Sequence, residues 1–86
     1  MTQTPWQFPH ISKKYQHSIE KCLEHIRKEI VEFEVETDPG KKMLEAVDVY
    51  HTAETFIRQY CELHHLDFEV IKLQVIMKNK SRGYYD

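Results

Sequence analysis

Apolar side chains recur along most of this sequence with the period of an α-helix. In the first third of the chain they are three or four residues apart over about five turns, a pattern typical of an amphipathic helix. The positions are Tyr15, Ile19, Cys22, Ile26, Ile30 and Phe33. With Ser12 as a candidate N-cap, the pattern predicts a helix from about residue 12 to residue 36. His17 and His25 lie off the apolar stripe, so we expect them to be exposed to solvent.

A second helix is predicted to begin directly after a short turn. Asp38 is a favourable N-cap, and Pro39 suits the first helical position because an N–H there has no partner within the helix. Two apolar stripes then follow the chain as far as His64. The first contains Ala46, Val47, Tyr50, Ala53, Ile57, Tyr60, Cys61 and His64, and the second contains Leu44, Val49, Phe56 and Leu63. Two stripes predict two packing partners, one within the chain and one in a second copy of it.

The last apolar segment is compatible with two kinds of element. Residues 68–77 are apolar and include β-branched side chains, which suits a strand. Leu66, Val70, Leu73 and Met77 nevertheless fit one face of a helix, and Phe68, Ile71 and Val75 fit the neighbouring face. A single strand in a helical chain has no partner except a symmetry mate. We therefore predict a helix from about residue 68 to residue 80, with Asp67 as its N-cap and Gly83 as its end.

These segments predict an all-α fold: a long antiparallel helical hairpin plus a third helix, assembled as a homo-oligomeric helical bundle. The 86 residues are expected to form one domain. A chain of this length has a limited core and often gains stability by oligomerising. Residues 1–10 contain two prolines and no period, so they are expected to form an irregular arm. Residues 79–86 form a basic and aromatic tail.

Charge and cysteine content narrow the class of protein. The net charge of −2 gives no general electrostatic footprint for binding DNA or RNA. Cys22 and Cys61 are too few for a disulfide framework, and we interpret them as small buried side chains rather than as redox or metal-binding groups. The sequence has no signal peptide and no apolar run long enough for a membrane span, so a soluble cytoplasmic protein is expected.

Two pairs of acidic residues are placed symmetrically about the turn. Glu29 and Glu32 precede it, and Glu45 and Asp48 follow it; each pair has the i, i+3 spacing that places both members on one side of a helix. In an antiparallel hairpin Glu32 lies opposite Glu45, and Glu29 lies opposite Asp48. Four converging carboxylates repel one another unless a cation joins them, and their oxygen atoms suit Mg²⁺. The alternative is that these acids form the solvated face of two amphipathic helices.

The pattern Lys28-Glu29-x-x-Glu32 followed by Glu45-x-x-Asp48 resembles the motif of the MazG family of all-α nucleoside triphosphate pyrophosphohydrolases. That motif is Glu-Glu-x-x-Glu, a spacer, then Glu-x-x-Asp; here Lys28 replaces the first acid and the spacer is short. The resemblance implies that Glu29, Glu32, Glu45 and Asp48 are catalytic and bind Mg²⁺, for which Mn²⁺ can substitute. It also implies that a homodimer or homotetramer hydrolyses an NTP or dNTP to the monophosphate and pyrophosphate.

The resemblance extends to the end of the chain, where residues 78–85 are similar to the tail of short MazG-like proteins. It implies that Lys78, Asn79 and Arg82 contact the phosphates of the substrate. Judged by their spacing alone, these side chains equally suit the C-terminal end of a helix dipole. The sequence therefore leaves two roles open for the tail, and the resemblance favours phosphate contact.

Three further residues are candidates for supporting roles. His51 is three residues after Asp48, so it contacts a phosphate, orients a water molecule or holds Asp48 in place. Trp6 is expected to pack on the helices, and the alternative is that it stacks on a nucleotide base. Tyr84 and Tyr85 are expected either to pack back on the helix or to stack on a base.

Two other classes of protein compete with the hydrolase. One is a non-catalytic helical module that binds a nucleotide or a partner protein, and the replacement of an acid by Lys28 favours it slightly. The other is a carboxylate-bridged di-iron protein, which uses Glu-x-x-His pairs on facing helices. The first acidic pair, Glu29 and Glu32, has no His at that offset, which argues against iron.

Overall fold

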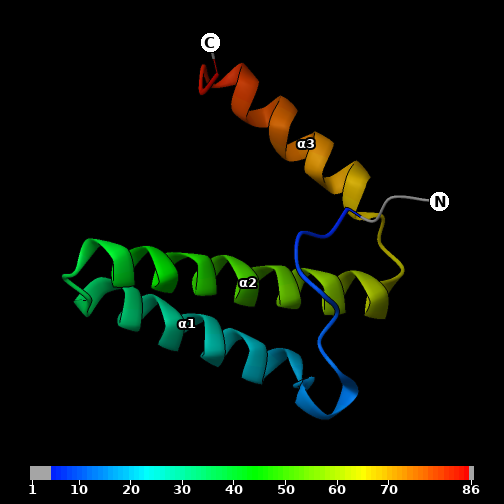
Figure 1. The fold of residues 1–86 in the computed structure, drawn as a ribbon. Coiled ribbons are helices and arrows are strands. Elements are labelled where there is room, and N and C mark those ends of the chain that lie inside the picture. Colours follow the sequence, from blue (N-terminus) through cyan, green and yellow to red (C-terminus); the bar gives the residue numbers. More distant parts are fainter. Residues whose placement is uncertain (1–4, 86) are drawn as a thin grey trace.

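The computed structural model of the chain describes residues 5–85, and every regular element in this range is helical. A 3₁₀ turn, η1 (Lys13–Tyr15), precedes the α-helices α1 (Ile19–Val35), α2 (Pro39–His64) and α3 (Phe68–Ser81). Helices α1 and α2 lie side by side and antiparallel, and α3 leaves them at an angle (Figure 1). The predicted hairpin with a third helix is therefore confirmed, and residues 68–77 are helical rather than extended.

The first helix begins later than the sequence pattern predicts. Ser12 precedes only the 3₁₀ turn, and its side chain makes no capping hydrogen bond. The cap of α1 is Ser18, whose hydroxyl accepts a hydrogen bond from the Lys21 N–H at 3.3 Å. The extended segment before it is held by Gln59 of α2, whose side-chain amide donates to the His17 carbonyl at 2.9 Å. Tyr15 therefore lies outside α1, although it continues the apolar spacing.

The turn between α1 and α2 matches its sequence signals. The Asp38 carboxylate accepts a hydrogen bond from the Lys41 N–H at 3.0 Å, and Pro39 is the first residue of α2. The Lys42 ammonium group reaches back across the turn and donates to the carbonyl oxygens of Phe33 and Glu36 at 3.0 and 3.2 Å. Because Lys42 satisfies carbonyls at the end of α1, it fixes the register of the two helices at the turn.

The core between α1 and α2 is small. Among the described residues only Cys22, Thr52 and Cys61 are buried, and all three are small side chains. Burial raises the pKa of both thiols, so they remain protonated at neutral pH. The interpretation of Cys22 and Cys61 as buried free thiols is therefore confirmed.

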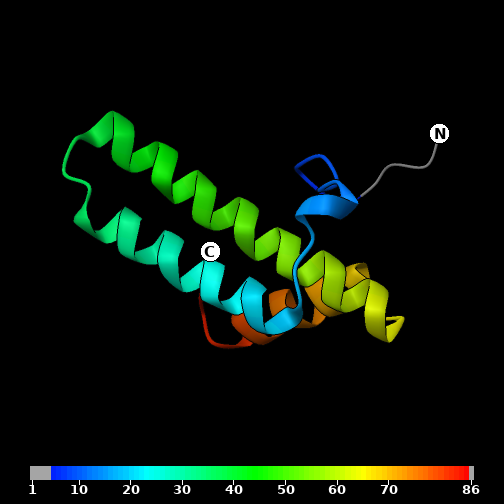
Figure 2. The same cartoon turned by 90° about the horizontal axis from the view of Figure 1, so that it is seen from below.

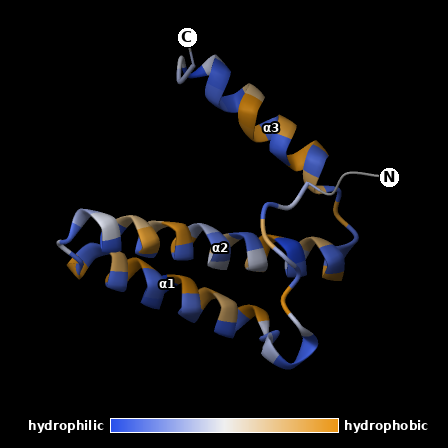
Figure 3. Ribbon diagram, viewed as in Figure 1, coloured by the Kyte–Doolittle hydropathy of each residue, from blue (hydrophilic) through white to orange (hydrophobic). Residues whose placement is uncertain are grey.

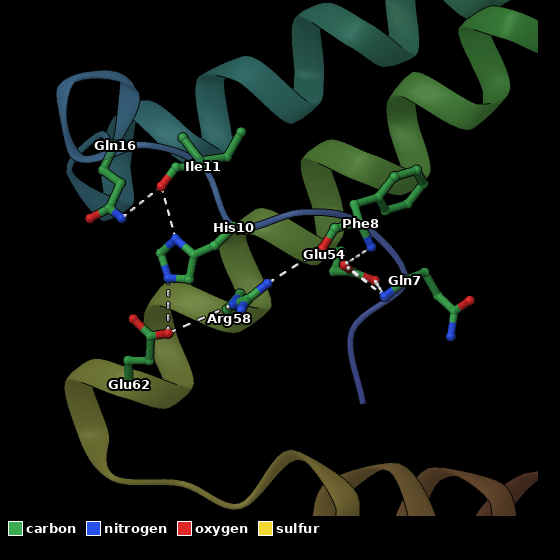
Figure 4. Close-up of polar contacts among 8 residues, drawn as sticks. All are labelled: Gln7, Phe8, His10, Ile11, Gln16, Glu54, Arg58 and Glu62. Atoms are coloured by element: carbon green, nitrogen blue, oxygen red, sulfur yellow. Dashed lines mark hydrogen bonds and ion pairs between the residues drawn. The ribbon is translucent and has the colours of Figure 1, made fainter. Parts of the chain in front are cut away.

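The N-terminal arm runs across α2 and is held there by side chains of that helix (Figure 4). The Glu54 carboxylate accepts hydrogen bonds from the backbone N–H groups of Gln7 and Phe8 at 2.9–3.1 Å. One helical turn later, Arg58 donates to the Phe8 carbonyl at 3.5 Å. The backbone of residues 7 and 8 thus gains partners that an irregular segment cannot supply for itself.

Trp6 joins the arm to both α2 and α3. Its ring lies 4.7 Å from the Phe68 ring, and the Arg58 guanidinium lies 5.3 Å from its centroid. Phe68 is the first residue of α3, so this contact lies where the last helix leaves the hairpin. The expectation that Trp6 packs on the helices is confirmed. The arm and the start of α3 both lie at the open end of the hairpin (Figures 1 and 2).

Helix α3 packs on α2 and does not contact α1 within the part of the chain that the structure describes. Its end is a Schellman motif: the Tyr84 N–H donates to the Asn79 carbonyl, and the Gly83 N–H donates to the Lys80 carbonyl, both at 3.0 Å. Gly83 has the positive φ of 79° that this motif requires. No helix among residues 5–85 combines the length and the apolar character that a membrane span needs.

Candidate metal centre

The hairpin brings three of the four predicted acids together. Ligand atoms of Glu29, Glu32 and Glu45 all lie within 4.8 Å of one another, and all three residues are half-buried. Glu29 and Glu32 come from α1, and Glu45 comes from α2. We call these three residues the acid triad. The pairing of Glu32 with Glu45 across the hairpin follows from a register that Asp38 and Lys42 fix at the turn.

Asp48 is not part of the acid triad, and it is exposed. Its charge still acts on Glu45 from a distance. The structure therefore places Asp48 at the edge of the cluster rather than at its centre. Lys28, which stands where the resemblance has an acid, is also exposed.

Two carboxylate oxygens of the triad are buried without a hydrogen-bond partner among the described residues. They are Oε2 of Glu29 and Oε2 of Glu45. The other oxygen of Glu29 accepts a hydrogen bond from Nε2 of His25 at 3.1 Å. A buried acceptor without a donor costs stability unless a ligand satisfies it. These two oxygens are therefore the atoms of the triad that a bound cation would satisfy.

Crowding of like charges affects the pKa of Glu45. Burial raises the pKa of Glu45, and the negative charges of the neighbouring acids, Glu32 foremost, raise it further. Both causes disfavour the carboxylate form. A positive ion between these residues would remove the second cause and oppose the first.

The donor set of the triad suits a hard divalent cation. Mg²⁺ prefers oxygen ligands and is usually held by a few carboxylates together with water and substrate phosphates. Three clustered carboxylates, two of them with an unpartnered buried oxygen, fit that requirement. The triad contains neither sulfur nor imidazole donors, which softer metals favour. Glu29, Glu32 and Glu45 are therefore the residues that could hold Mg²⁺ or Mn²⁺.

Millimolar Mg²⁺ is expected to raise the melting temperature of the protein by several degrees. A ligand that binds only the folded state stabilises it by about 2.7 kcal/mol when its free concentration is about 100 times its Kd. Glu32→Gln should abolish most of the shift, and Asp48→Asn should reduce it less because Asp48 lies outside the triad. Thermal unfolding followed by circular dichroism tests this. A wild-type curve that Mg²⁺ and Mn²⁺ leave unmoved would contradict the metal site.

A cavity of about 250 Å³ lies between α1, α2 and the segment that precedes α1. Its lining consists of Ile11, Tyr15, His17, Cys22, His25, His51, Thr52 and Thr55. His25 belongs both to this lining and, through its hydrogen bond to Glu29, to the acid triad. The cavity therefore adjoins the triad.

His51 contributes a second polar group without a partner. Its ring stacks on Phe8 of the arm at 4.5 Å, and its Nε2 atom is buried with no hydrogen-bond partner among the described residues. Among the described residues, the side chain of His51 makes no hydrogen bond to Asp48. The structure therefore does not support the prediction that His51 holds Asp48 in place. His51 instead lines the cavity, where its free nitrogen can contact a ligand.

His25 is exposed, as its off-stripe position predicts, but the sequence pattern did not assign it a place at the site. In the structure it lines the cavity and donates to Glu29. The available signal was its position four residues before Glu29, the spacing at which side chains on one helix meet. His17 also lines the cavity, and its ring lies 6.4 Å from that of His25.

The predicted phosphate-binding residues of the tail are not brought to the triad within one chain. Lys78 and Arg82 are exposed near the end of α3, a helix that does not contact α1 in the described part of the chain. Asn79 is half-buried, and its backbone carbonyl takes part in the helix end. Tyr84 and Tyr85 are 65% and 49% exposed, so neither is buried against α3.

Comparison with known proteins gives this chain no relatives: no family model, no curated protein and no solved structure matches it significantly.

Proposed function

We propose that the protein is a Mg²⁺-dependent nucleoside triphosphate pyrophosphohydrolase that converts an NTP or dNTP to the monophosphate and pyrophosphate. The observation that carries this proposal is the acid triad, with its two unpartnered buried oxygens. The MazG resemblance of the same residues supplies the reaction. The triad alone supports a metal site, and the cavity beside it supports an organic ligand.

Each triad residue has a role that its surroundings support. When bound, Mg²⁺ would neutralise charge on the phosphates and lower the pKa of a water molecule. Glu29 is oriented by His25, which leaves its Oε2 atom for the ion. Glu45 faces Glu32 across the hairpin and has an oxygen without a partner among the described residues, so a carboxylate oxygen of Glu45 that the ion leaves free could accept the proton from the attacking water. Glu32 completes the oxygen donor set.

The adjoining cavity supports a nucleoside as the organic part of the substrate. Its volume of about 250 Å³ is slightly below the usual size range of small-molecule sites, as expected for one base or sugar. Its walls combine apolar and aromatic side chains with the unpartnered Nε2 atom of His51. Such a mixture suits a planar polar ring, which needs apolar contact on its faces and hydrogen bonds at its edges.

The tail supplies the cations that a triphosphate needs. Lys78, Lys80 and Arg82 are exposed in or next to the last turn of α3, and Asn79 can both donate and accept. Arg is suited to bidentate contact with phosphate oxygens, and Lys acts there as a point charge. We assign phosphate contact to Lys78, Asn79 and Arg82.

The decisive experiment incubates the protein with each NTP and dNTP in the presence of Mg²⁺ and separates the products by chromatography over time. Attack at the α-phosphorus is expected to give the monophosphate and pyrophosphate together, without a diphosphate intermediate. Accumulation of the diphosphate and orthophosphate would place the attack at the γ-phosphorus and contradict the proposed reaction. Omitting Mg²⁺ and adding EDTA gives the matched control.

A non-catalytic nucleotide-binding module is the second candidate. Two observations favour it: Asp48 is exposed outside the triad, and the tail cations lie on a helix that does not contact α1 in the described chain. Such a module would bind Mg²⁺ and a nucleotide without turnover. Calorimetry with a non-hydrolysable triphosphate distinguishes it from the enzyme, because binding without any product from natural nucleotides supports the module alone.

A further inference from the structure

Helix α3 has two apolar faces and a partner for only one of them. Phe68 and Ile71 are half-buried on the face toward α2 and the arm. The other face is exposed: Val70 is 53%, Leu73 56% and Met77 62% exposed, and Leu66, just before the helix, is 44% exposed. A helix that is apolar on both sides is normally buried on both sides.

Helix α2 has a matching exposed stripe on the side that does not face α1. Met43, Val47 and Tyr50 are 61%, 46% and 53% exposed, and they follow one another at spacings of four and three residues. Helix α3 diverges from α2, so it leaves the part of α2 near the hairpin turn uncovered (Figure 1). The hydropathy colours show apolar residues along both helices where they diverge (Figure 3). Tyr50 contacts Phe8 of the arm, with ring centroids 5.3 Å apart, and both apolar surfaces otherwise remain largely exposed.

The surface area of the chain is too large for a compact monomer. The accessible surface is 7234 Å², whereas a compact monomer of 10.4 kDa exposes about 5400 Å². The radius of gyration is 15.0 Å, against about 12 Å for a compact domain of 86 residues. The excess of roughly 1800 Å² per chain is comparable to the area that one subunit contributes to an obligate interface.

Charge is distributed so that one copy complements another. Residues 68–85 contain four basic residues and one acidic residue, whereas the hairpin, residues 19–64, contains eleven acidic and six basic residues. Packing α3 of one copy beside the hairpin of another brings opposite charges together. This complementarity favours a second copy of the chain over an unrelated partner.

We propose that the exposed face of α3, formed by Val70, Leu73 and Met77 and extended by Leu66 just before the helix, packs on the Met43, Val47 and Tyr50 stripe of α2 in a second copy. The interface is symmetric, so each copy supplies both surfaces. It covers the second apolar face of α3 and places the basic end of that helix beside an acidic hairpin. The assembly goes beyond the proposed reaction and does not depend on it.

Leu73→Asp tests the interface, and Val31→Asp is its control. Val31 lies on α1 and is 56% exposed, the same fraction as Leu73, so both substitutions introduce one charge at an equally exposed apolar residue. Light scattering at micromolar concentration should give at least twice 10.4 kDa for the wild type and for Val31→Asp. Leu73→Asp should raise the dissociation constant of the assembly at least about 30-fold, because a symmetric interface contains the substituted residue twice.

A monomeric wild type at this concentration would overturn the proposal, as would an assembly that Leu73→Asp leaves intact. If Leu73→Asp does not fold by circular dichroism, hydrogen exchange of the wild type decides instead. The amides of α3 should exchange more slowly above the dissociation concentration than below it. Equal exchange rates in α3 at both concentrations would place the interface elsewhere and refute the assignment.

Discussion

Replacing Glu45 by Gln is expected to abolish nucleotide hydrolysis and, in the absence of metal, to make the protein more stable. The activity falls because the substitution removes both a charged metal ligand and the assigned proton acceptor. The decrease in activity should exceed the roughly 10–100-fold decrease that follows replacement of a residue that only holds a metal ligand in place. The stability rises because the substitution removes a carboxylate whose charge the other acids oppose. A residue that served only the fold would not raise stability when it is replaced.

The stability effect has a defined dependence on pH. The pKa of Glu45 is raised in the folded protein above its ordinary value of 4.5, so the folded state binds the proton more tightly than the unfolded state. Metal-free wild-type protein therefore loses stability as the pH rises from that ordinary value through the raised pKa, and the loss is complete above it. Glu45→Gln has no such proton, so this part of the pH dependence should disappear.

Melting temperatures measured in EDTA from about pH 4 to about pH 8 test the prediction. Glu34→Gln is the matched control, since Glu34 is an exposed acid on α1 outside the triad and the substitution changes the net charge equally. The control should keep both hydrolysis and the pH dependence of the wild type. A Glu45→Gln variant that keeps wild-type turnover would remove this residue from the site.

The hairpin and the triad were predictable because their signals are local. Asp38 and Pro39 fix where α1 gives way to α2, and counting outward from that turn pairs Glu32 with Glu45. The placement of Asp48 at the edge was harder to predict. The symmetry of the sequence counts residues, whereas side chains follow a helix that turns about 100° per residue. The same spacing of three residues keeps Glu29 and Glu32 together on α1, so the spacing alone does not show that Asp48 lies outside the triad.

Features that depend on contacts distant in the sequence were not predictable. The start of α1 moved from Ser12 to Ser18 because Gln59, about forty residues later, holds the His17 carbonyl. The arm is ordered by Glu54 and Arg58 of α2, and nothing in the arm itself indicates those partners. The apolar faces of α3 were visible in the sequence, but their directions relative to the hairpin depend on Trp6 and Phe68.

Two impaired variants are expected to restore activity when they are mixed. The proposed function assigns metal binding to the triad and phosphate contact to Lys78 and Arg82, yet α1 and α3 of one chain do not contact each other in the described residues. The proposed interface places the basic end of α3 beside the hairpin of a second copy. A complete site then takes its acids from one chain and its cations from the other.

The mixture combines Glu45→Gln with the double variant Lys78→Ala/Arg82→Ala. Loss of one charge-assisted contact to phosphate costs about 1.5–3 kcal/mol, so Arg82→Ala alone should raise KM and lower kcat/KM at least about tenfold, and the double variant should be lower still. After unfolding and refolding together, half of the dimers are mixed, and one of their two sites has both native halves. Activity should then recover to about a quarter of the wild-type value.

The controls separate the proposals from one another. Refolded alone, Glu45→Gln must stay inactive and Lys78→Ala/Arg82→Ala must keep only its lowered activity. The tail variant must also keep its stabilisation by Mg²⁺, because the tail does not bind the metal in this scheme. Active wild type whose variants fail to complement would mean that the tail serves the acids of its own chain, through a movement of α3. Wild type that is inactive on all nucleotides would refute the enzyme and leave the light-scattering test of the interface unaffected. Recovery of a quarter of the activity requires both the interface and the division of the site between two chains, since neither variant carries a complete site of its own.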